Sequence, residues 1–189
     1  LLFGSDKMSK SKGNVIYADD LIRRFGLDGV RYYLLSEMPY QNDGTITYEN
    51  FIARYNTDLA NTLGNLVSRT VAMTKKYFDG VIPSPAGDEG PDAELKAAAA
   101  DAYANFTANM DTFRAADALD AVFTLLRRAN KYIDETAPWA LAKDEAQRAR
   151  LGTVLYNLLE SLRIAAILLR PAIPDSAEKI LAAIGSPDD

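Results

Sequence analysis

The chain contains no cysteine and no histidine among its 189 residues. Without cysteine it can form neither disulfides nor thiolate zinc sites, although this alone does not identify the compartment. Without histidine, imidazole acid–base chemistry and histidine metal sites are excluded within these residues. No apolar run approaches the roughly 20 residues that a membrane span needs, and no N-terminal segment has the pattern of a secretory signal. We therefore expect no membrane partner.

Basic residues are also in the minority, since 21 Lys and Arg face 26 Asp and Glu and give a net charge of −5. Taken alone, this charge argues against a nucleic-acid partner. The acidic residues are concentrated, however, with five and no basic residue in 79–94, and four against one in 175–189. The rest of the chain has a positive balance, so a locally basic helical surface is possible.

Most of the chain has the pattern of amphipathic helices. From Tyr48 apolar residues recur every three or four positions, which is the spacing of one buried helix face. A Gly- and Pro-rich connector follows at 79–92, and further helical patterns lie at about 92–110, 113–135, 144–170 and 175–184. Short connections between such helices predict an all-α, antiparallel helix bundle. We assign residues 49–189 to this helical domain.

Residues 1–48 form a separate segment. They begin with an apolar, strand-like stretch at 1–3, so the chain is expected to be part of a longer protein. A polar loop from Gly4 to Asn14 precedes a helix that starts near Leu21, with Asp19 or Asp20 as its cap. Gly26 should end that helix, Asp28 should open another, and residues 39–47 should form a loop.

The loop at 7–14, called the lysine loop below, is the most informative segment. Its sequence Lys-Met-Ser-Lys-Ser-Lys-Gly-Asn places three ammonium groups within six residues. Such a flexible cationic loop suits a polyanion whose phosphate oxygens move during a reaction. It lacks the glycine spacing of a Walker loop. On charge alone, the competing interpretation is a solvated basic loop.

This string resembles the second signature of class I aminoacyl-tRNA synthetases. The resemblance implies that the loop closes over ATP, which these enzymes use with Mg²⁺. Lys10, the second lysine of the signature, would stabilise the charge on departing pyrophosphate and Lys7 would assist. Met8, Ser9 and Ser11 would shape the ATP-binding loop. This is electrostatic catalysis without a protein nucleophile.

The first signature of that class contains histidine and therefore cannot be present, and the nucleotide-binding sheet is missing as well. The chain would carry about half of an active site, and we do not expect it to catalyse a reaction alone.

Three further stretches, 29–35, 51–69 and 130–139, resemble the methionyl-tRNA synthetase family. The resemblance implies a class Ia anticodon-binding bundle and the activity of a methionine–tRNA ligase, which activates methionine with ATP and charges tRNA(Met). It also implies that the bundle reads the CAU anticodon in the anticodon stem-loop. The positions that match the family's recognition residues are Asn65, Arg69 and Trp139, with Asn130 and Asp134 in support.

The residues offer independent support for such a surface. On a helical wheel at 100° per residue with Leu59 at zero, the apolar face of the helix that begins at Tyr48 centres at about 20°. On the same wheel Asn61, Asn65 and Arg69 fall at about 200°, 240° and 280°. Amides and a guanidinium can bind base edges and phosphates, although the stripe could be a merely solvated face. Trp139, the only tryptophan, follows Pro138 and could stack on an unpaired base or fill a helix junction in the core. Asn130 could be a structural amide that positions Asp134 or Trp139.

Two alternatives remain open at this stage. The chain could be a non-catalytic helical tRNA-binding module derived from a class I synthetase, although such a module has no use for a pyrophosphate clamp. It could also be a helical scaffold whose lysines are incidental. The family resemblance implies a cytoplasmic location, and we expect this chain to be a monomer.

Overall fold

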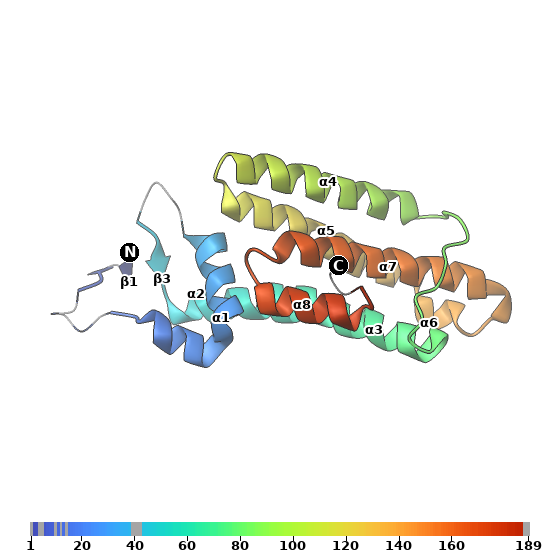
Figure 1. Cartoon of the computed structure of the whole chain (residues 1–189), viewed down its shortest axis with the longest axis horizontal. Helices are drawn as coiled ribbons and strands as arrows, with labels where there is room; N and C mark the ends of the chain where they lie inside the picture. The colour runs from blue at the N-terminus through green and yellow to red at the C-terminus, as the bar shows by residue number, and fades with distance from the viewer. Residues whose placement is uncertain are drawn as a thin grey trace.

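The computed structural model describes residues 2–3, 6–9, 11, 13, 15–38 and 43–186. A small sheet and two helices lie at one end of the molecule, and a bundle of long helices makes up the rest (Figure 1). The strands are β1 (Leu2–Phe3), β2 (Asp6–Lys7) and β3 (Thr45–Ile46). The helices are α1 (Ala18–Glu37), α2 (Tyr48–Arg54), the π-helix η2 (Tyr55–Gly64), α3 (Asn65–Phe78), α4 (Asp92–Asp111), α5 (Ala115–Thr136), α6 (Pro138–Leu141), the 3₁₀ turn η3 (Glu145–Gln147), α7 (Arg148–Leu169) and α8 (Pro174–Ala183).

The three strands form a sheet in the order β2-β1-β3. β1 pairs with β2 in antiparallel orientation and with β3 in parallel orientation, so that Leu2 lies opposite Thr45. The predicted strand at the N-terminal end is confirmed. The prediction that 39–47 is only a loop is wrong, because two of its residues pair with a strand more than 40 positions earlier.

The predicted break at Gly26 is confirmed. Gly26 has φ 76° and ψ 161° within α1, a left-handed backbone that glycine adopts without a steric penalty. The predicted cap is wrong, because the helix begins at Ala18 and places Asp19 and Asp20 in its first turn. Acidic side chains are favourable there because they face the positive end of the helix dipole.

A single long helical rod, residues 48–78, runs from β3 along the bundle (Figure 1). It begins at Thr47, whose hydroxyl accepts a hydrogen bond from the Asn50 N–H at 3.1 Å. The predicted helix from Tyr48 is confirmed, but the expectation that it is an ordinary α-helix throughout is wrong. Ten residues at 55–64 have π-helical hydrogen bonds, in which each N–H reaches back five residues, as Asn65 does to Ala60. Such turns are rare and are frequently found at functional sites.

The bundle is built around α7. Along the chain α4, α5, α7 and α8 alternate in direction, and the rod completes the packing (Figure 1). The predicted all-α antiparallel bundle is therefore confirmed. Fourteen of the 22 residues of α7 are buried, and Leu155, Leu158 and Leu162 are among the largest fully buried side chains. Burial of such side chains contributes about 1.5–3 kcal/mol each.

One segment, Glu145–Leu169, is long and apolar enough by composition to cross a membrane. This differs from the sequence-based expectation that no such stretch exists. However, 72% of its apolar window is buried inside the bundle, as expected for a helix at the centre of a protein core.

A buried polar network joins three helices of the bundle. Asp92 on α4 is 0% exposed and accepts hydrogen bonds from Tyr132 at 2.6 Å and from two Arg150 nitrogens at 2.5 and 2.8 Å. Asn157 in turn donates to the Tyr132 hydroxyl at 3.3 Å. The sequence suggests that Asp92 belongs to the acidic connector, but in the structure its carboxylate lies in the core and fixes α4 against α5 and α7.

Candidate nucleic-acid interface

Arg69 and Asp134 lie together on the surface between α3 and α5. One guanidinium nitrogen of Arg69 is 3.5 Å from Asp134 Oδ1, and the side chains are 42% and 72% exposed. Exposed ion pairs of this kind contribute about 0–1 kcal/mol. Arg69 can therefore exchange this contact for a phosphate or a base edge, and Asp134 for a donor on a base edge, at little cost.

Asn65 lies one helical turn before Arg69 and is also exposed. Because both belong to α3, their predicted alignment on one face holds. Asn61 is exposed too, but it lies in η2, where each turn holds more residues and the rotation per residue is smaller than the 100° assumed for the stripe. The angle predicted for Asn61 therefore does not apply as calculated, whereas Asn65 and Arg69 lie four residues apart in one α-helix.

Trp139 projects from a sharp break between helices. α5 ends at Thr136, Ala137 adopts a left-handed backbone with φ 43°, and Pro138 opens the short helix α6. The indole is 46% exposed, so it does not fill the core at this junction. An exposed indole five residues after Asp134 can stack on an unpaired base, since every base offers a π face.

Asn130 is used inside the protein. Its amide nitrogen donates to the carbonyl oxygen of Thr62 in η2 and to that of Leu126 on its own helix, both at 3.0 Å. The side chain is half-buried. The Asn130 amide therefore connects the π-helix to α5 and has a structural role.

The lysine loop leaves the sheet at β2, where Lys7 is exposed. Met8 packs against a small core made by the sheet, α1 and α2, which includes Ile46 and Phe51. The hydroxyls of Ser9 and Ser11 are 2.8 Å apart. Lys10 and Lys12 lie outside the described residues. In Figure 1 the sheet and α1, which flank this loop in the chain, lie at the opposite end of the molecule from α6.

A second polar network joins α1 to the rod and was not predicted from the sequence. The Tyr32 hydroxyl on α1 donates to Asp58 in η2 at 2.7 Å, and Arg54 donates to the same carboxylate oxygen at 2.9 Å. Burial and the hydrogen bond to Asp58 raise the pKa of Tyr32 far above its usual range. The spacing of Arg54 and Asp58, four residues apart, was the available signal. This network fixes the helix that follows the lysine loop to the rod that carries Asn65 and Arg69.

Comparison with protein families gives two matches. Residues 1–71 match a family described as tRNA synthetases class I (M), and residues 83–189 match the anticodon binding domain of methionyl tRNA ligase. The second match covers more than half of the chain. The predicted boundary between 48 and 49 stays a prediction, and in the structure it falls at the start of the rod.

Individual relatives agree with the family matches. A methionine–tRNA ligase of Caldanaerobacter subterraneus is 49% identical over all 189 residues, and one of Clostridium acetobutylicum is 54% identical over 180 residues. The chain spans about 30% and 28% of the lengths of these relatives. The solved structure of Mycobacterium tuberculosis methionyl-tRNA synthetase in complex with methionyl-adenylate is 43% identical. It has a TM-score of 0.89, with 93% of this chain and 35% of that chain covered.

Proposed function

Because the chain belongs to the methionyl-tRNA ligase family, we propose that it supplies the ATP-phosphate loop and the anticodon-reading surface of a methionine–tRNA ligase. In the proposed reaction the methionine carboxylate attacks the α-phosphate of ATP. The bond between the α- and β-phosphates breaks, and pyrophosphate leaves. The methionyl group then passes from the adenylate to tRNA(Met), which releases AMP.

The proposed role of the lysine loop is electrostatic. Lys10 would neutralise the charge that builds up on departing pyrophosphate, and Lys7 at the end of β2 would assist. Pairing of β2 with β1 anchors the start of the loop. Met8, the residue after Lys7, packs against the small core.

Magnesium would accompany ATP in this reaction. Within the part of the chain that the structure describes, no three acidic side chains gather into a group that could hold an ion. In this proposal Mg²⁺ would bind to the phosphates of ATP.

The observation that carries the anticodon proposal is the exposed Trp139 at a helix break, in a chain that also exposes Asn65, Arg69 and Asp134. Unpaired bases are bound by stacking on aromatic rings together with polar contacts to their edges. The Asn130 amide would help to position these residues, because it holds η2 against α5.

The proposal is tested by titrating a fluorescent tRNA(Met) anticodon stem-loop with the chain at two salt concentrations. Affinity should fall as salt rises, because phosphate contacts release counterions. Replacing the first anticodon base should remove more affinity than exchanging a base pair in the stem. Arg69→Ala should reduce this base selectivity, whereas Arg114→Ala, which removes another exposed ion-paired arginine, should not. Equal binding of all stem-loops would contradict anticodon reading.

Trp139→Ala should weaken binding of the same stem-loop by about 1–3 kcal/mol, the contribution of one stacked base. In the intact enzyme it should slow aminoacylation and leave adenylate formation unchanged. Tyr103→Ala is the matched control, because Tyr103 is an aromatic residue with 62% exposure on α4. If both variants bind equally well, Trp139 does not stack on the anticodon. Circular dichroism checks that both variants remain folded.

A further inference from the structure

Phe113 is the most exposed large apolar side chain among the described residues. It lies in the turn between α4 and α5 and is 80% exposed. Met110, one turn earlier at the end of α4, is 39% exposed. Aromatic rings contribute more than most side chains when they are buried, so this one forgoes a large favourable contribution while it stays in water. The two residues are called the tip patch below.

The backbone of Phe113 is strained. Its φ of 59° lies in the left-handed region, where the Cβ atom of an L-residue comes too close to the following carbonyl oxygen. Two other non-glycine residues among those described have a positive φ, namely Asp79 and Ala137. Aspartate tolerates this conformation, and Ala137 forms the break before Trp139. Phe113 is thus the one bulky side chain held in a conformation that suits glycine.

The turn itself does not require an aromatic ring. The Arg114 N–H donates to the Asn109 carbonyl at 2.9 Å, and the Phe113 N–H donates to the Met110 carbonyl at 3.0 Å. This pair of bonds forms a Schellman motif, in which glycine is the usual residue at the left-handed position. Because only backbone groups make these bonds, glycine would form the same turn with less strain. Strained residues of this kind cluster at functional sites.

The tip patch lies at the end of the bundle that carries the sheet. In Figure 1 the turn between α4 and α5 is at the same end of the molecule as α1 and β3. Ser36, in the last turn of α1, and Ala116, three residues after Phe113, line the same small cavity. The start of α5 therefore lies beside the end of α1.

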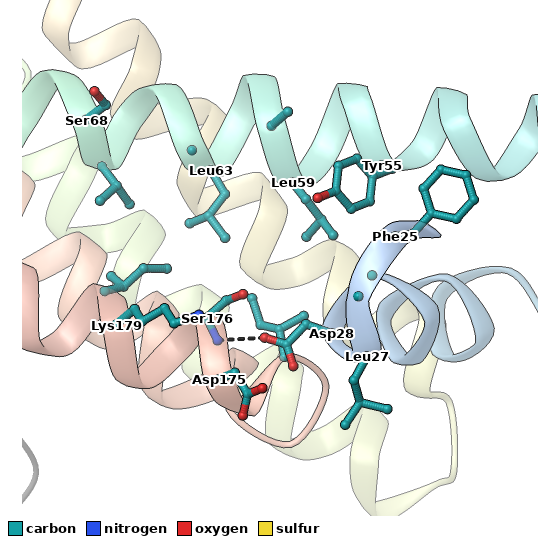
Figure 2. Close-up of a pocket in the computed structure, with 17 residues that line it drawn as sticks. Phe25, Leu27, Asp28, Tyr55, Leu59, Leu63, Ser68, Asp175, Ser176 and Lys179 are labelled. Atoms are coloured by element: carbon teal, nitrogen blue, oxygen red, sulfur yellow. Dashed lines mark hydrogen bonds between the residues drawn. The ribbon is translucent and has the colours of Figure 1, made fainter. Parts of the chain in front are cut away.

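This end of the molecule is held together by contacts on a second side of α1. Asp28 accepts a hydrogen bond of 2.6 Å from the Ser176 N–H in the first turn of α8 (Figure 2). Arg31 donates to the Pro171 carbonyl at 2.5 Å, in the turn before α8. Since α1 is fixed to α8 as well as to α5, the tip patch keeps a defined position relative to the helix that follows the lysine loop.

Most of the relatives' length lies outside this chain, which spans 30% of the Caldanaerobacter subterraneus ligase. Residues 1–71, which include the sheet and α1, match the class I synthetase family rather than the anticodon-binding domain. In the proposed reaction the lysine loop acts on ATP, so the ATP-binding part of the intact enzyme has to meet this loop. That part therefore lies at the same end of the bundle as the tip patch.

We propose that the tip patch docks in an apolar recess on the part of the intact synthetase that lies outside this chain, with the Phe113 ring as the anchor. The proposal rests on the proposed function in one respect, namely that the ATP-binding part meets the lysine loop. Interfaces depend on a few side chains, often aromatic, that fill desolvated pockets. The turn already presents the ring to solvent, so docking would require little further ordering. The contact would fix the angle between the bundle and the ATP-binding part.

The test is hydroxyl-radical labelling, read by mass spectrometry, of the 189-residue chain and of the intact synthetase without ATP or tRNA. The oxidation rates of Phe113 and Met110 are expected to be at least about fivefold lower in the intact enzyme, because docked anchors lose contact with water. Tyr103, which is 62% exposed on α4 and ten residues before Phe113, is the internal control and should keep its rate. Equal rates for Phe113 in the two proteins, or equal protection of Tyr103, would overturn the proposal.

Phe113→Gly gives a second measurement, because its two effects have opposite signs. In the chain it should raise the Tm by about 2–4 °C, since relief of strain outweighs the greater freedom of glycine in the unfolded state. In the intact synthetase it should restore the oxidation rate of Met110 to the value in the chain. Phe113→Leu keeps an apolar side chain and should retain the protection of Met110. A lower Tm of the glycine variant, or Met110 still protected in it, would contradict the docking of this ring.

The same labelling separates other occupants of the tip patch. Protection of Phe113 that appears only after tRNA(Met) is added would overturn the proposal in favour of an RNA contact. Protection in the chain that grows with its concentration would overturn it in favour of a second copy. The stem-loop titration can fail while Phe113 is still protected in the intact enzyme, so anticodon reading and docking are tested separately.

Discussion

Replacing Asp92 by alanine is expected to lower the free energy of unfolding of the chain by about 3–5 kcal/mol, the cost of removing one partner from a buried ion pair. The reason is that Arg150, whose side chain is 12% exposed, would keep its charge and lose both carboxylate contacts. The Tyr132 hydroxyl would lose its acceptor too, and the Glu89 N–H would lose its hydrogen bond to Asp92 Oδ2. Urea denaturation followed by circular dichroism measures the change.

Asp88→Ala is the matched control, because Asp88, four residues before Asp92, forms an exposed ion pair with Lys96. It should change stability little, since exposed pairs contribute little. If Asp92→Ala were no more destabilising than Asp88→Ala, the buried network would not hold the bundle together.

The same network predicts how stability depends on pH. Burial by itself would raise the pKa of the Asp92 carboxyl, but hydrogen bonds from Arg150 and Tyr132 outweigh it and hold the pKa below its usual range. The folded state therefore binds this proton less readily than the unfolded state does. The contribution is fully present above about pH 4, the ordinary value for aspartate, and is lost as pH falls through the lower folded-state pKa. In Asp92→Ala this part of the acid destabilisation should be absent.

Replacing Lys10 by alanine in the intact enzyme is expected to slow methionyl-adenylate formation about 10²- to 10³-fold. The loss of one preorganised group that stabilises developing charge costs this much in other enzymes. Exchange of labelled pyrophosphate into ATP measures this step without any tRNA. Anticodon stem-loop affinity should stay unchanged, because the sheet and α1, which flank the lysine loop, lie at the opposite end of the molecule from α6.

Lys143→Ala is the control for loss of an exposed lysine, since Lys143 lies beyond α6 and far along the chain from the loop. It should leave pyrophosphate exchange unchanged. A normal exchange rate in Lys10→Ala would show that this lysine does not stabilise the departing pyrophosphate. Reduced stem-loop binding would instead indicate that the substitution disturbs the fold.

The helical domain could be predicted from the sequence because its signals are local. The spacing of apolar residues, every three or four positions, predicts the ends of α4, α5, α7 and α8 to within a few residues. Gly26 marked the break in α1 for an equally local reason, since its left-handed backbone suits glycine. The exposure of Asn65 and Arg69 also agrees with their polar position on the rod.

What the sequence did not reveal depends on contacts between distant positions. Thr45 and Ile46 form a strand only because β1 lies beside them. Asp92 was counted with an acidic connector because its partners Tyr132 and Arg150 are 40 and 58 residues away. The hydrogen bond from the Ser176 N–H to Asp28 likewise requires α8, almost 150 residues later in the chain.

The π-helix also has a consequence for comparing this chain with others. Each of its hydrogen bonds encloses one more residue than an α-helical bond does, so residues 55–64 take up extra chain length for the same number of turns. An otherwise similar rod made only of α-helix would need a shorter segment between Phe51 and Leu66 to present the same faces to the bundle. Alignments should therefore expect gaps inside this helix, a place where insertions and deletions are normally considered forbidden.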